Sequence, residues 1–76
     1  MLNIKILGTG CPKCKTLFNN VHTALANKGV KAHVEKVEDI QEIMKYNVLS
    51  TPVLVINEEI KIKGRPADVK EIEELL

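Results

Sequence analysis

Two cysteines separated by two residues are the side chains of this sequence best suited to chemistry. They lie in Cys11-Pro12-Lys13-Cys14, which follows an expected strand and opens an expected helix. Residues three positions apart lie on one face of a helix with Cα atoms roughly 5 Å apart, within the range that a disulfide accepts. The pair is therefore predicted to cycle between a dithiol and a disulfide with little movement of the backbone.

Size and composition predict one soluble globular domain over residues 1–76. Hydrophobic residues make up 45% of the sequence and charged residues 28%, which are ordinary values for such a domain. The sequence has no apolar run of about 18 residues that would indicate a membrane span, and its N-terminus lacks the regions of a secretory signal. We therefore expect a cytoplasmic protein without a membrane partner. In a reducing compartment, a close CxxC pair is more often catalytic or metal-binding than structural.

The charged residues divide the chain into a basic first part and an acidic second part. Residues 1–34 contain five Lys and no acid, whereas all ten carboxylates lie from Glu35 onward beside six bases. The CxxC motif belongs to the basic part. Five scattered Lys within a net charge of +1 form a weak footprint for nucleic acid, so no nucleic-acid partner is expected.

Hydrophobic periodicity predicts strands and helices in the order βαβαββα. The strands are expected at residues 3–7, 30–37, 53–56 and 60–63, and the helices at 12–28, from 39 to about 46, and from 66 onward. Asp39 and Glu42 have a capping-box-like spacing at the start of the second helix. Pro66 suits the first position of the third helix.

The connections between these elements predict a mixed sheet. A crossover helix requires the first two strands to be parallel, whereas the short turn at residues 57–59 makes the last two antiparallel. The first strand and the all-apolar third strand are expected to be central. The predicted fold class is therefore α/β, with a four-stranded mixed sheet of order 2-1-3-4 flanked by three helices.

Cys11 is the expected nucleophile because its surroundings favour a thiolate. At the start of a helix, unpaired N–H groups and the helix dipole stabilise an anion. Lys13 and Lys15 add positive charge, and no carboxylate precedes Glu35. Cys14, one turn further in, is expected to be more shielded and to attack second, on the mixed disulfide that Cys11 forms with a substrate.

Three motifs carry a family resemblance that covers essentially the whole chain. They are Gly8-Thr9-Gly10-Cys11-Pro12-Lys13-Cys14, Thr51-Pro52 before an apolar strand, and Gly64-Arg65 before the last helix. Together they resemble the small redox-active disulfide proteins of the thioredoxin superfamily, thioredoxin- or glutaredoxin-like and found in archaea and bacteria. The resemblance implies a thioredoxin-like fold and a thiol–disulfide oxidoreductase that carries electrons between protein or small-molecule disulfides and a disulfide reductase. It implies no cofactor beyond the Cys11–Cys14 disulfide.

The same resemblance assigns roles to residues. It implies that Cys11 attacks and Cys14 resolves, that Pro52 is cis and faces the disulfide, and that the Thr51 backbone pairs with an extended substrate segment. The expected supporting residues around the two cysteines are Pro12, Lys13, Thr9 and Gly10.

Two departures from the family pattern affect this transfer. Thioredoxins proper carry a Trp before the first cysteine and a buried acid beneath the motif, whereas this chain has Gly10, no Trp and no carboxylate before Glu35. The sequence therefore names no proton acceptor for Cys14. Residues 64–68 also lack the Gly-Gly-acid pattern of glutaredoxins, which argues against glutathione as a partner, although Asp68 near the expected helix start leaves it open.

Metal binding is the main alternative, because CxxC also occurs in domains that carry Cu(I). Those domains run βαββαβ and usually place a Met before the motif, where this chain has Gly10. His22 would lie about 12 Å along the helix from Cys14, too far to share an ion. An iron–sulfur cluster held by two CxxC motifs across a dimer stays open. So does a pure binding module in which the cysteines are incidental.

Overall fold

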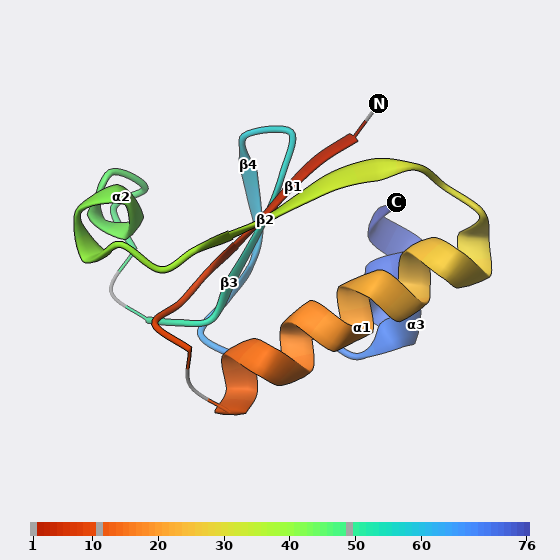
Figure 1. Cartoon of the computed structure of the whole chain (residues 1–76), viewed down its shortest axis with the longest axis horizontal. Coiled ribbons are helices and arrows are strands. Elements are labelled where there is room, and N and C mark those ends of the chain that lie inside the picture. Colours follow the sequence, from red (N-terminus) through yellow and green to blue (C-terminus); the bar gives the residue numbers. More distant parts are fainter. Residues whose placement is uncertain (1, 11, 49) are drawn as a thin grey trace.

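The computed structural model describes residues 2–10, 12–48 and 50–76, and within them the elements follow the expected order βαβαββα (Figure 1). The strands are β1 (Leu2–Leu7), β2 (Ala32–Val37), β3 (Val53–Ile56) and β4 (Glu59–Lys63). The helices are α1 (Pro12–Lys28), α2 (Ile40–Met44) and α3 (Val69–Leu75). Five of these elements begin or end one to three residues away from the positions expected from the sequence, whereas α1 and β3 have the expected bounds. No helix in the described part of the chain is long and apolar enough to cross a lipid bilayer.

The strands form one sheet in the order β2-β1-β3-β4, which confirms the predicted topology. β1 runs parallel to β2 and antiparallel to β3, and β3 runs antiparallel to β4. Figure 1 shows α1 and α3 side by side along one face of this sheet, with α2 on the other side. Because β1 and β3 are antiparallel and Leu7 pairs with Val53, the end of β1 and the start of β3 lie together, next to the start of α1.

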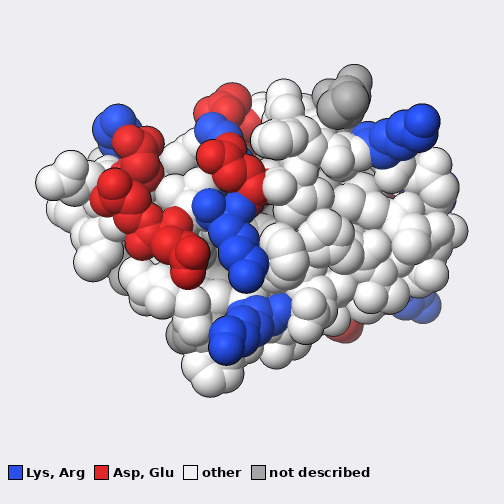
Figure 2. Space-filling view, in the orientation of Figure 1, with Lys and Arg blue, Asp and Glu red and all other residues white. Residues whose placement is uncertain are grey.

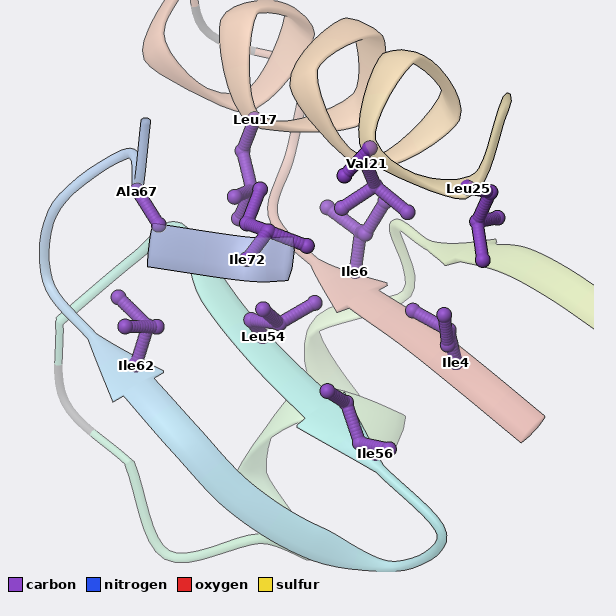
Figure 3. Packing of buried hydrophobic residues seen from close by; sticks show 11 residues of the cluster. Ile4, Ile6, Leu17, Val21, Leu25, Leu54, Ile56, Ile62, Ala67 and Ile72 are labelled. Carbon is purple, nitrogen blue, oxygen red and sulfur yellow. The ribbon is translucent and has the colours of Figure 1, made fainter. Parts of the chain in front are cut away.

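The larger part of the core lies between the sheet and the helices α1 and α3 (Figure 3). Alternate residues of the central strands point toward these helices and meet a stripe of apolar residues at helical spacing. The fully or almost fully buried members of this cluster include Ile4, Ile6, Leu54 and Ile56 from the strands and Leu17, Val21 and Ile72 from the helices.

A smaller cluster covers the opposite face of the central strands. Leu7, Val53 and Val55 are almost completely buried there against Ile43 of α2 and Val48. β3 is therefore buried on both faces, as its uninterrupted apolar sequence predicted. The two clusters therefore pack α1 and α2 against opposite faces of the same central strands.

The starts of the two short helices differ from what the sequence predicted. Asp39 caps α2, but its carboxylate accepts from Gln41 N at 2.9 Å, and Glu42 pairs with Lys45 at 3.0 Å rather than completing a capping box. The expected start of the last helix at Pro66 is wrong.

α3 begins instead at Val69, because Asp68 has an extended backbone and its carboxylate accepts from Glu71 N at 2.8 Å. Capping by a short acidic side chain decides where this helix starts. Residues 64–68 consequently form a loop between β4 and α3.

Ile72→Ala is expected to lower the free energy of unfolding by about 2–5 kcal/mol, because truncation of a fully buried side chain leaves a cavity between α3 and the sheet. Ile40→Ala is a matched control, since Ile40 is also helical but is 62% exposed, and its cost should be at most about 0.5 kcal/mol. Denaturant unfolding followed by circular dichroism measures both. Equal losses in the two variants would contradict the packing of α3 described here.

Candidate functional site

The loop between β1 and α1 carries most of the residues singled out in the sequence. Thr9 and Gly10 are exposed there, and Gly10 has φ +86, a backbone conformation that favours glycine. Pro12 is the first residue of α1, where its missing N–H costs no hydrogen bond. Lys13 is exposed in the first turn. Cys11, the expected nucleophile, lies outside the described residues.

Cys14 is buried, with 6% of its surface exposed, and begins the apolar stripe of α1 that continues through Leu17 and Val21. Its sulfur lies against the backbone of Gly8. A Cβ built on Gly8 would lie 2.3 Å from the Cys14 Sγ and 3.3 Å from the Cys14 Cβ. Position 8 therefore has no room for a side chain while the thiol is in place.

Gly8 is a site residue that the sequence analysis missed. Its backbone N–H donates to the Val37 carbonyl at 2.9 Å, so the loop continues the pairing of β1 with β2 by one residue. In the sequence, a glycine between a strand and the CxxC motif indicates only a turn. The structure gives it a second reason, the close approach of a neighbouring sulfur.

The Thr51–Pro52 peptide bond is cis, and Pro52 is fully buried while Thr51 is exposed. The Pro52 Cα lies 4.0 Å from the same Cβ position built on Gly8. The Pro52 carbonyl accepts from the Gly64 N–H at 2.9 Å, which connects this loop to the end of β4. The loop after β1, the first turn of α1 and the loop before β3 thus come together around Gly8.

A cavity of about 60 Å³ opens beside the Cys14 side chain. Its lining combines apolar atoms and backbone with two ammonium groups and one carboxylate: Ile6, Gly8, Gly10, Cys14, Lys15, Lys36 and Glu38. The carboxylate oxygen Oε2 of Glu38 lies 3.3 Å from a Cβ built on Gly10. The first 34 residues alone indicated purely basic surroundings for the motif. The structure adds the carboxylate of Glu38 to them.

The pairing of the strands explains how Glu38 reaches the motif. Leu7 and Val37 are partners in the parallel register of β1 and β2, so the residues that follow the two strands emerge at the same edge of the sheet. Gly8 and Glu38 are these residues. The sequence predicted that these two strands are parallel. Aligning their ends is the signal that could have identified Glu38.

The loop before α3 uses its polar groups within the fold. The Arg65 guanidinium donates to the Glu71 carboxylate, and this hydrogen bond raises the pKa of Arg65 and lowers the pKa of Glu71. Asp68 is occupied as the cap of α3. These contacts give both side chains a structural role beside any contact with a ligand.

The two histidines lie away from Cys14. The His22 ring packs edge-on against Phe18, with centroids 4.4 Å apart, and His33 is exposed in β2. Among residues 2–10, 12–48 and 50–76, no three His, Cys, Asp or Glu side chains gather in a geometry that could hold a metal ion.

Gly8→Ala is expected to reduce the free energy of unfolding of the reduced protein by about 1–3 kcal/mol, because the added methyl group overlaps the Cys14 sulfur. In a Cys14→Ala background, which lacks that sulfur, the same substitution should cost at least about 1 kcal/mol less. Denaturant unfolding of the four proteins in the presence of a reductant measures this coupling. Additive losses would show that the sulfur does not exclude a side chain at position 8.

Comparison with known proteins places this chain in a family. The model of the thioredoxin domain family matches residues 2–76. A curated thioredoxin of Methanothermobacter thermautotrophicus is 36% identical over 76 residues, covering 100% of this chain and 99% of the relative. A curated thioredoxin of Methanocaldococcus jannaschii is 40% identical over 76 residues, covering 100% of this chain and 87% of the relative.

A solved structure described as thioredoxin-2, a component of the protein secretion machinery of the malaria parasite, has the same fold. It superposes with a TM-score of 0.73 at 15% identity, over 99% of this chain and 80% of that one. The fold is thus thioredoxin-like, with its mixed sheet in the order 2-1-3-4. The chain belongs to the thioredoxin domain family, a family of thiol–disulfide oxidoreductases.

Proposed function

We propose that residues 1–76 act as one thioredoxin-like domain that exchanges thiols and disulfides through Cys11 and Cys14. The observation that carries this function is the position of the Cys14 thiol, buried at the start of α1 against Gly8, the residue near which Pro52 also lies. A buried thiol three residues after a second cysteine is suited to resolve a mixed disulfide, because it is kept from outside reagents but is close in sequence to its target.

The proposed reaction takes place in two exchanges. The Cys11 thiolate attacks a substrate disulfide, forms a mixed disulfide and releases one substrate thiolate, which takes up a proton. The Cys14 thiolate then attacks the Cys11 sulfur, so that the bond to the substrate breaks and a Cys11–Cys14 disulfide forms. Two electrons have passed to the substrate as two thiols. A disulfide reductase returns two electrons and two protons to the domain, so the redox-active disulfide is its only proposed cofactor.

The segment around Pro52 is the proposed contact for the substrate. Thr51 is exposed at the edge of the site, while Pro52 is buried beside Gly8. The Pro52 carbonyl already accepts a hydrogen bond from the Gly64 N–H. The Thr51 backbone is therefore available to pair with an extended segment of a protein disulfide substrate. Thr9, Gly10, Pro12 and Lys13 support the loop that carries Cys11.

Glutathione has less support as a partner than a protein disulfide. The polar side chains of residues 64–68 are engaged within the fold, with Arg65 bonded to Glu71 and Asp68 capping α3. A domain that works as a dithiol needs a reducing compartment, so we place its action in the cytoplasm.

Insulin reduction with a thiol reductant separates the proposed activity from a metal-binding or purely structural role of the cysteines. Wild-type protein should accelerate the reaction, and Cys11→Ser should abolish the acceleration because it removes the attacking thiolate. Cys14→Ser should lose turnover but accumulate mixed disulfides on Cys11, seen by non-reducing electrophoresis and mass spectrometry.

The two serine variants control for each other, since each removes one sulfur from the same motif. Equal background rates in all three proteins would rule out the oxidoreductase function. Tight stoichiometric Cu(I) or Zn(II) in the purified protein without turnover would support metal carriage instead.

Lys13→Glu is expected to raise the pKa of Cys11, because it exchanges a positive charge for a negative one in the first turn of α1. Lys28→Glu makes the same charge change in the last turn of α1 and should leave that pKa almost unchanged. The thiolate absorbance of the reduced protein, titrated with pH, measures both shifts. An unchanged titration in Lys13→Glu would refute the electrostatic activation of Cys11.

A further inference from the structure

We propose that the Glu38 carboxylate accepts the proton that Cys14 must lose before it attacks the mixed disulfide. This role rests on the proposed function, because it concerns the second exchange of that reaction. A thiol is a nucleophile only as its thiolate, and Cys14 is almost completely removed from bulk solvent. The proton therefore needs an acceptor inside the site.

The cavity beside Cys14 provides the path to this acceptor. Cys14 and Glu38 line the same space of about 60 Å³, which is large enough to hold water. Gly8 and Gly10 form part of the wall and carry no side chain that would close it. Glu38 itself is exposed, so it can return the proton to solvent.

The other charged groups that line the cavity are both cations. Lys15 comes from α1, and Lys36 comes from β2, with its ammonium 4.3 Å from the centroid of the Phe18 ring. An ammonium group stabilises a thiolate but has no lone pair with which to accept its proton. Within the described residues, Glu38 is the one carboxylate in the lining of this cavity.

The backbone holds Glu38 at this place. Val37 is paired with Leu7 in the sheet, and its carbonyl accepts from the Gly8 N–H at 2.9 Å. On the other side, Asp39 is fixed as the cap of α2. Glu38 thus stands between two anchored residues, and the position of its Cα does not depend on its own side chain.

The proton balance of the step is closed. Cys14 gives its proton to the Glu38 carboxylate, and the resulting thiolate attacks the Cys11 sulfur. The bond between Cys11 and the substrate sulfur breaks, and the substrate leaves as a thiolate that takes up a proton from the Glu38 carboxylic acid or from water. Glu38 ends the step as a carboxylate, and no electron passes through it.

Single-turnover reaction with dithiobis(nitrobenzoate) separates the two exchanges. The first thionitrobenzoate is released when Cys11 attacks the reagent, and the second is released when Cys14 resolves the mixed disulfide. In Glu38→Gln the second release should slow by about tenfold or more while the first keeps its rate. The difference should disappear at high pH, where Cys14 ionises without help, and Glu38→Asp should restore part of the rate.

Glu35→Gln is the matched control, because it makes the same change three residues before Glu38. Glu35 lies on the face of β2 opposite to Lys36 and the cavity. It should leave both releases unchanged. An unchanged or faster second release in Glu38→Gln would overturn the role, since removal of a negative charge without loss of a base favours the thiolate. Equal slowing of both releases would also overturn it. If wild-type protein shows no release that depends on Cys11, the proposed function itself fails, and the role of Glu38 fails with it.

Discussion

The packing of α1 against the central strands is the contact on which the rest of the structure depends. Leu17 and Val21 close the main cluster against Ile4 and Ile6, and they are completely buried. Because Cys14 lies three residues before Leu17 on the same stripe, this packing also presses the thiol against the loop that leaves β1. One helix face thus forms the core and positions the sulfur.

The expected fold was confirmed because its signals are local. The uninterrupted apolar run of β3, the alternation of charged and apolar residues in β4, the glycine after α1 and the short turn between the last strands are each visible in a few neighbouring residues. The start of α3 was missed because two local signals competed, and the cap formed by Asp68 prevailed over the preference of Pro66 for a first helical position.

The site was harder to predict because its contacts join distant segments. Cys14 and Pro52 both come close to Gly8 only after the sheet has formed, and Glu38 reaches the cavity through the register of β1 with β2. The separation of charge along the sequence is therefore not a separation in space. Figure 2 shows acidic side chains gathered toward the end of the molecule where α2 lies, with basic side chains close to some of them.

The burial of Cys14 within the stripe of α1 links the proposed redox chemistry of the domain to its folding. A sulfur that belongs to the core contributes to the free energy of unfolding, and a change in its bonding changes that contribution. By thermodynamic linkage, any substitution that stabilises one redox form of the domain more than the other shifts the dithiol–disulfide equilibrium by the same free energy. A core substitution far from the cysteines would therefore change the reduction potential of the proposed disulfide if it acted unequally on the two redox forms.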